Sequence, residues 1–363
     1  MVAFTGDKAS STSLFKAECT ACVMSVISTK RSLSKSSGSA RPGPGPAACN
    51  GAITVTSAFL LQASLSFSPV LLRRERILND RPIIGILAQQ TMGHLSEMAQ
   101  TYVTSSNVKH LESAGCRVAV IRLYLSESEY EKLFYSINGI LFPGGAVDLQ
   151  NSEFARVAGI FYRLAVEACD QGDYFPVWGT CLGHQLLTAL TTGENLLSRT
   201  DSDNMALPLD FTDEAKSCKM FRNFAPEMTR VLSETPLTGN FHKYSLTLEA
   251  FEANKKLSSF YRVISTNTDR QRVTFVSTME AFRYPIYGTQ WHPEGNRYFW
   301  KKRMDIPHSP LGVRISFLMA EFFVSEARKN FHHYEDKLDE DSILIDRYAC
   351  TVDKVNYQTV YLF

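Results

Sequence analysis

The chain has 363 residues, enough for about two domains of ordinary size or for one large α/β domain with an appendage. Its 38 Lys and Arg residues nearly balance 37 Asp and Glu residues, so a net charge of +1 creates no field that attracts nucleic acid or an anionic membrane. The eight cysteines are too sparse for a small disulfide-stapled scaffold. We therefore expect neither nucleic acid nor, for the mature form, a membrane as partner.

Residues 1–80 are predicted to form a leader outside the folded domain. Up to about residue 50 the composition is rich in small, polar and basic residues, which is typical of disorder. Residues 52–72 are mostly apolar but are interrupted by Thr, Ser, Gln and Pro69, and they resemble a signal-peptide core more than a membrane-spanning helix. We expect secretory targeting, and an uncleaved disordered leader is the alternative.

From Arg81 onward, short apolar runs alternate with amphipathic segments. Buried strands are predicted at 82–88, 116–123, 139–145 and 174–179. Helices are predicted at 101–115, 126–137 and 152–172. This alternation favours an α/β fold with a doubly wound, mostly parallel central sheet and helices on both faces.

The second half of the chain is richer in strand-like segments. Candidate strands lie at 205–211, 244–251, 262–268, 272–279 and 285–291. A helix at 311–330 is expected to cover the sheet and to close a catalytic domain at 81–335. Residues 336–363 then form a C-terminal tail that packs on the domain, and 357–363 can add an edge strand.

Three of the predicted strands end in residues that are suited to chemistry. Gly144 and Gly145 form the turn into which the third strand runs, Cys181 follows the fourth strand, and His292 and Glu294 follow the last. In open α/β sheets, active groups collect at the carboxyl ends of strands. The sequence therefore predicts one site built from these three ends.

Cys181 lies in the string GTCLG, residues 179–183, which has the spacing of a strand-to-helix elbow around a nucleophile. Flanking glycines tolerate the sharp turn, and the helix N-terminus favours a thiolate. Attack on an amide creates an oxyanion, for which the backbone N–H groups of Leu182 and Gly145 are the expected donors. A lone cysteine is more often a buried core residue, so this motif alone does not establish catalysis.

His292 and Glu294 are two residues apart, with Pro293 between them. At the end of a strand, side chains at this spacing point the same way. Glu294 is then expected to orient the imidazole, while His292 accepts the Cys181 proton and later donates one to the leaving amine. The occurrence of all three motifs in this order favours the catalytic interpretation.

The strings FPGG, GTCLGHQ and QWHPE resemble the class I glutamine amidotransferase-like superfamily. Over about residues 81–335, the chain is similar to the γ-glutamyl hydrolase family in the strings INGILFPGGAVDL, YFPVWGTCLG, NFHKYSL, STMEAFRYPIYGTQWHPE and FVSEARKN. The resemblance implies a triad in which Cys181 is the nucleophile, His292 the base and Glu294 the orienting acid. His242 matches a histidine that lies near the active site in that family. We expect His242 and Gly144 to contact the substrate, and a structural, hydrogen-bonded role for His242 stays open.

The activity that the resemblance implies is hydrolysis of γ-glutamyl amide bonds, removing glutamates from folylpoly-γ-glutamates through a γ-glutamyl thioester. We expect no cofactor for this reaction and no metal, because His332 and His333 have no further metal-ligand residues beside them. The resemblance suggests a homodimer, and the signal-like segment suggests a location in the lysosome or outside the cell. Two alternatives stay open: a glutaminase component of an amidotransferase, and a non-catalytic binding protein on the same fold. The first is suggested by His184 and Gln185, which follow CLG here as they do in amidotransferase motifs.

Overall fold

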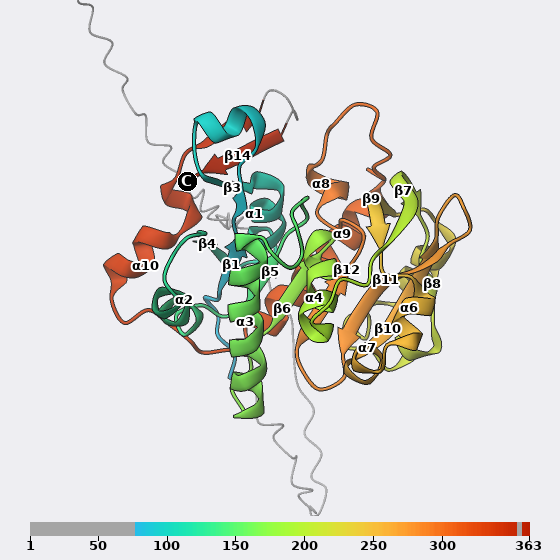
Figure 1. Cartoon of the computed structure of the whole chain (residues 1–363), viewed down its shortest axis with the longest axis horizontal. Coiled ribbons are helices and arrows are strands. Elements are labelled where there is room, and N and C mark those ends of the chain that lie inside the picture. The colour runs from blue at the N-terminus through green and yellow to red at the C-terminus, as the bar shows by residue number, and fades with distance from the viewer. Residues whose placement is uncertain (1–76, 354–357) are drawn as a thin grey trace, which may run out of the picture. The chain divides into compact units, whose positions relative to one another are not determined.

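The computed structural model describes residues 77–353 and 358–363, so the expected signal segment at 52–72 lies outside the described residues. Within this part of the chain, the main sheet has eight strands (Figure 1). Their order is β4 (Arg117–Ile121), β1 (Ile83–Leu87), β5 (Ile140–Phe142), β6 (Val177–Thr180), β12 (Ile286–Thr289), β11 (Thr274–Ala281), β10 (Tyr261–Thr268) and β8 (Asp210–Phe211). The first five run parallel and the last three pair antiparallel, which confirms the mostly parallel α/β sheet.

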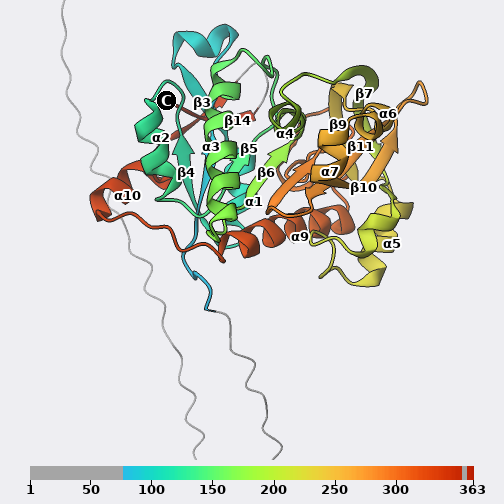
Figure 2. The same cartoon turned by 60° about the horizontal axis from the view of Figure 1, so that its bottom comes forward.

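Helices cover both faces of this sheet, as Figure 2 shows for α3 and α9 on opposite sides. One face packs against α2 (Glu127–Phe134), α3 (Glu153–Asp170), α4 (Leu182–Thr192), α6 (Leu248–Ala253) and α7 (Lys255–Phe260). The other packs against α1 (Ser105–Glu112), α5 (Pro226–Glu234) and α9 (Pro310–Ala327). In β1, Ile83 packs into the hydrophobic core on the α3 side of the sheet and Ile84 into the core on the α9 side, because successive strand residues point to opposite faces. No helix in the described ranges has the length and apolarity needed to cross a membrane.

Local capping residues mark the starts of α2 and α3 and the end of α3. The Ser126 side chain accepts from the Glu129 N–H while the Glu129 carboxylate accepts from the Ser126 N–H, which forms a capping box at the start of α2. Ser152 caps α3 by accepting from the Ala155 N–H at 3.1 Å. Gly172, with φ +89°, follows α3 in the left-handed region that favours glycine.

A second sheet corrects two expectations. Among the described residues it has four strands in the order β13 (Cys350–Asp353), β14 (Gln358–Leu362), β3 (Thr101–Thr104) and β2 (Gln89–Gln90). Residues 101–104, predicted to start a helix, form β3 because the nearby β2 pairs with one side of it and the distant β14 with the other, and helix α1 starts only at Ser105. The C-terminal strand forms, but β14 lies between β13 and β3 rather than at an edge.

The remaining elements are a two-stranded ribbon and several short helices and turns. A two-stranded ribbon pairs β7 (Ser198–Leu207) with β9 (Thr238–Ser245). The strand predicted at 244–251 is therefore wrong beyond Ser245, because Thr247 caps α6 by accepting from the Ala250 N–H. The short elements are α8 (Gly295–Tyr298), α10 (Lys337–Ile343) and the 3₁₀ turns η1 (Gly93–Glu97), η2 (Asp213–Lys216) and η3 (Ile345–Arg347).

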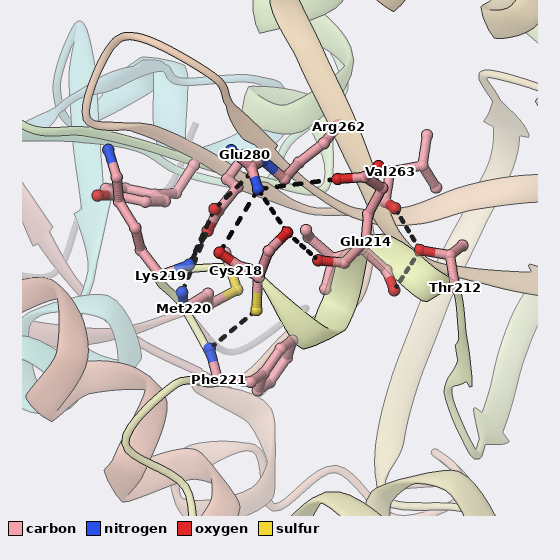
Figure 3. Close-up of polar contacts among 12 residues, drawn as sticks. Thr212, Glu214, Cys218, Lys219, Met220, Phe221, Arg262, Val263 and Glu280 are labelled. Atoms are coloured by element: carbon pink, nitrogen blue, oxygen red, sulfur yellow. Dashed lines mark hydrogen bonds and ion pairs between the residues drawn. The ribbon is translucent and has the colours of Figure 1, made fainter.

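A buried carboxylate on β11 fixes the chain that follows η2 (Figure 3). Glu280 is fully buried and accepts hydrogen bonds from the backbone N–H groups of Lys219, at 2.9 and 3.0 Å, and Met220, at 3.1 Å. Arg262 places its Nε 3.7 Å from the same carboxylate. Burial raises the pKa of Glu280, and these N–H donors and Arg262 oppose that rise. The carboxylate thus satisfies backbone donors that would otherwise be buried without acceptors.

Candidate active site

The strand register brings the three predicted chemical strand ends together. Phe142 of β5 pairs with Gly179 of β6, and Thr180 of β6 pairs with Thr289 of β12. Because these strands are adjacent and parallel, the residues that follow each of them leave the sheet at the same edge. The glycine pair, the cysteine and the histidine therefore converge, although they are far apart in the chain.

Cys181 occupies a strained turn between β6 and α4. Its φ of 51° and ψ of −103° are unusual for a residue with a side chain, and strain of this kind costs about 1–3 kcal/mol. The Cys181 N–H donates to the Thr289 carbonyl at 2.8 Å, which ties the turn to β12. Leu182 begins α4, so its N–H has no acceptor within the helix and is available at the turn.

Both glycines of the elbow are required by close backbone packing. A Cβ on Gly179 would lie 2.5 Å from the Gly183 carbonyl group, and a Cβ on Gly183 would collide with the carbonyl of Phe142. Backbone atoms cannot move aside as a flexible side chain does. The G-x-C-x-G spacing thus reflects the contact of α4 with β5 and β6, as well as the turn itself.

His292 and Glu294 meet on a turn rather than on a strand. Strand β12 ends at Thr289, and Glu294 adopts helical angles immediately before α8. The expectation that strand alternation aligns the two side chains is therefore wrong, although the side chains do meet: His292 Nδ1 lies 2.7 Å from Glu294 Oε1. The His292 N–H donates to the Gly239 carbonyl of β9 at 3.0 Å, which holds the turn in place.

The imidazole of His292 lies between Glu294 and Cys181. Glu294 engages Nδ1, which leaves Nε2 on the side of Cys181, and the thiol lies close enough to the imidazole to raise its pKa. A Cβ on Gly144 would stand 2.6 Å from His292 Cε1 and 3.3 Å from Cys181 Cβ, so the glycine turn lies against both residues. A side chain at position 144 would displace the imidazole.

The electrostatics of this group favour a charged imidazole. Burial by itself lowers the pKa of His292, but the Glu294 carboxylate and Cys181 outweigh it and raise the pKa to about 10. Burial raises the pKa of Glu294, and the His292 cation reverses that effect so that the pKa is lowered overall. The pair is therefore an imidazolium and a carboxylate at neutral pH.

Behind Glu294 lies a histidine that sequence reasoning missed. His110 of α1 lines a small cavity together with Glu294, and Arg297 places Nη2 3.1 Å from His110 Nδ1. Because arginine only donates, Nδ1 is the acceptor and the proton of neutral His110 is on Nε2. Burial lowers the pKa of His110 to about 3. No local pattern distinguishes this residue from any other polar residue on a helix.

A cavity of about 660 Å³, the active-site cavity, opens beside Cys181. Gly145, Leu182 and His242 line it, so the residues expected to donate to an oxyanion and the histidine expected to contact substrate share it with the thiol. The volume lies within the range of small-molecule sites. Across the described ranges, no group of three or more His, Cys, Asp or Glu side chains is arranged to hold a metal ion.

Hydrogen bonds within the protein occupy both ring nitrogens of His242. Its Nδ1 lies 2.9 Å from Ser245 Oγ and its Nε2 lies 3.1 Å from Asn240 Oδ1. Burial, together with the nearby charge of His292, lowers the pKa of His242 to about 3, so the ring is neutral. These contacts favour the structural alternative for its ring nitrogens, although His242 also lines the active-site cavity.

His184 lies outside the active-site cavity. It is fully buried on α4, and a Cβ on Gly288 of β12 would approach its Nδ1 to 2.6 Å. Burial lowers its pKa to about 3. His184 therefore packs between helix and sheet as a neutral side chain.

A turn-bound cysteine beside a buried His–Glu pair, at the carboxyl edge of a parallel sheet, is the arrangement of a cysteine-type hydrolase on an α/β fold. Residues 82–294 match the family model described as Peptidase C26. The chain is 49% identical to human γ-glutamyl hydrolase over 78% of its own length and 90% of the relative's, and 46% identical to the mouse enzyme over 84% and 96%. The chain belongs to this family, the γ-glutamyl hydrolases of peptidase C26.

A solved structure of a glutamine amidotransferase from Thermotoga maritima also aligns with the chain. It covers 68% of this chain and 97% of that one, at 12% sequence identity and a TM-score of 0.39.

Proposed function

We propose that this protein hydrolyses γ-glutamyl amide bonds and that its substrates are folylpoly-γ-glutamates. The observation that carries the proposal is the contact of His292 with Cys181 on one side and Glu294 on the other, beside an open cavity. Family membership supports the substrate class, because the human and mouse relatives are named γ-glutamyl hydrolases.

In the proposed reaction, the Cys181 thiolate attacks the γ-carbonyl carbon and the carbonyl oxygen becomes an oxyanion. The N–H groups of Leu182 and Gly145 stabilise that charge. The C–N bond breaks as His292 gives its proton to the departing amine, which leaves a γ-glutamyl thioester. A water then attacks the thioester carbonyl carbon and gives a proton to His292. The C–S bond breaks, which releases the γ-carboxylic acid product and restores the Cys181 thiolate beside the imidazolium.

Glu294 acts on this reaction through His292. Its carboxylate fixes the imidazole orientation and stabilises the imidazolium that must be present when the amine departs. No metal or cofactor has a role in the scheme. We further propose that the protein works as a homodimer in the lysosome or outside the cell, and that residues 81–335 form its catalytic domain.

The test is product analysis by liquid chromatography after incubation with a pteroyl-penta-γ-glutamate and, separately, with free glutamine. We expect loss of γ-linked glutamates with the wild-type protein and none with Cys181→Ala. Turnover of glutamine alone would instead support the glutaminase alternative. Absence of turnover with either compound, between pH 4 and 8, would favour a non-catalytic binding protein.

A further inference from the structure

The Gly144–Gly145 turn is held from the side of the second sheet by Gln89 of β2. Gln89 is 6% exposed, and its Nε2 donates a hydrogen bond to the Gly144 carbonyl. A Cβ on Gly145 would collide with the same amide group, so the glutamine side chain lies directly against the turn. Nothing in the triad chemistry accounts for this contact.

A tyrosine fixes which end of the Gln89 amide faces the turn. Tyr102 pairs with Gln89 across β3 and β2, and its hydroxyl donates to Gln89 Oε1 at 3.1 Å. Burial and the nearby Asp353 raise the pKa of Tyr102, so the hydroxyl keeps its proton and remains a donor. With Oε1 engaged by Tyr102, the Nε2 donor is the end that meets the Gly144 carbonyl.

The hydrogen bond from Gln89 also fixes the direction of the Gly145 N–H, because the Gly144 carbonyl and that N–H belong to one peptide unit. In a trans peptide, the carbonyl of one residue and the N–H of the next point in opposite directions. Because Gln89 binds the Gly144 carbonyl, the Gly145 N–H points away from Gln89. Gly144 lies against Cys181 and His292, and Gly145 lines the active-site cavity with Cys181. Two consecutive glycines rotate this peptide easily, so its orientation needs an external partner.

We propose that Gln89 and Tyr102 are positioning residues that hold the Gly144–Gly145 peptide with the Gly145 N–H directed at the oxyanion. The inference rests on the proposed function, since it assigns the support of the oxyanion site to the second sheet. Strand β3 is itself held by the C-terminal strand: Tyr102 pairs with Leu362, and the Phe363 N–H donates to the Thr101 carbonyl at 2.9 Å. The end of the chain thus stabilises the strand that carries Tyr102.

The test compares Gln89→Glu and Tyr102→Phe with Gln90→Glu, a control at the exposed neighbouring position of β2. Glutamate lacks the amide donor and repels the Gly144 carbonyl, so we expect kcat on a γ-glutamyl substrate to fall about 100-fold, as for loss of one oxyanion donor. Tyr102→Phe loses one orienting hydrogen bond and should lower kcat about 10-fold. KM should stay within about twofold in each case, and the control should match the wild type.

Two further readouts separate positioning from a general disturbance of the site. Alkylation of Cys181 by iodoacetamide forms no oxyanion, so its rate should be unchanged in both variants. Affinity for an N-acyl glutamate γ-semialdehyde, whose adduct with the thiol places an oxygen in the oxyanion site, should fall in parallel with kcat. Unchanged kcat in both variants, or alkylation that falls together with kcat, would overturn the proposal.

Failure of the proposed function gives a different result. A wild-type protein that is alkylated at Cys181 but cleaves no γ-glutamyl bond contradicts the substrate assignment. The positioning role is then tested by the affinity for the semialdehyde alone. Weaker binding to Gln89→Glu and Tyr102→Phe than to the wild type supports the role, and equal binding is the other outcome. The second outcome contradicts the role of the two residues.

Discussion

His292 Nδ1 lies 2.7 Å from Glu294 Oε1, and the two side chains are 11% and 3% exposed. An ion pair this deeply buried makes each partner depend on the other's charge, because removal of one leaves the other without compensation. The relationship explains why the pKa of His292 is raised to about 10 in a place where burial alone would lower it.

Replacement Glu294→Gln should move the alkaline limb of activity to lower pH. The neutral amide no longer stabilises the imidazolium, so His292 loses its proton below its present pKa of about 10, and the form that protonates the leaving amine disappears earlier. We expect a downward shift of at least about one pH unit in the profile of kcat/KM. The exposed Glu249→Gln serves as control and should match the wild type. An unmoved alkaline limb would contradict the assigned role of Glu294.

Gly183→Ala should disrupt the elbow. The added methyl group would meet the Phe142 carbonyl, a backbone atom that cannot move without displacing β5, and we expect at least about 3 kcal/mol of destabilisation with loss of activity. Gly159→Ala on α3 is the matched control, because its methyl group finds Leu190 at an ordinary 3.4 Å. That change should be neutral or slightly stabilising in urea unfolding, since alanine favours a helix. Equal stability of the two variants would argue against the close packing of α4.

Glu280→Ala should destabilise the fold by about 3 kcal/mol. The substitution leaves the N–H groups of Lys219 and Met220, and the Arg262 side chain, without their carboxylate. Hydrogen exchange at 219 and 220 should quicken more than exchange in β5. Arg283→Ala removes a surface ion pair whose arginine is 78% exposed, and should change stability by less than about 1 kcal/mol. Unaltered exchange at 219 and 220 would contradict the anchoring role.

Acid should weaken the fold through its buried histidines. His110, His184 and His242 have pKa values lowered to about 3 from 6.5, chiefly by burial. Below about pH 6.5 the unfolded chain binds these protons and the folded chain does not, so the free energy of unfolding falls as pH drops toward 3. Each group contributes a slope of about 1.4 kcal/mol per pH unit. His292 works in the opposite direction: its stabilisation is full below pH 6.5 and is lost as pH rises through about 10.

Urea unfolding between pH 7 and 4 tests the effect of these histidines. In the variant His184→Gln, one of the three groups no longer titrates, so the unfolding free energy should fall less steeply with acid than in the wild type. Parallel curves for the two proteins would show that His184 does not stay neutral in the folded state.

The sequence determined the elements whose signals are local. The helix starts near residues 126 and 152, the apolar run of β1 and the G-x-C-x-G spacing each depend on residues within a few positions of one another, and each predicted its structure correctly. The same holds for the order of the strand ends, since a parallel α/β sheet brings its carboxyl edges together whatever the helices between them contain.

Tertiary structure decided what depends on partners far along the chain. Thr101–Thr104 became a strand because β14 pairs with it, and Thr101 lies 262 residues from Phe363, to which it is hydrogen-bonded. His110 lines a small cavity with Glu294, and Gln89 binds the Gly144 carbonyl. Neither contact produces a periodic pattern in the sequence. Local patterns report backbone preference and burial, whereas the pairing of distant strands and the orientation of a single amide follow from the packed core. The chemical groups of this site could thus be read from the sequence, and their supports could not.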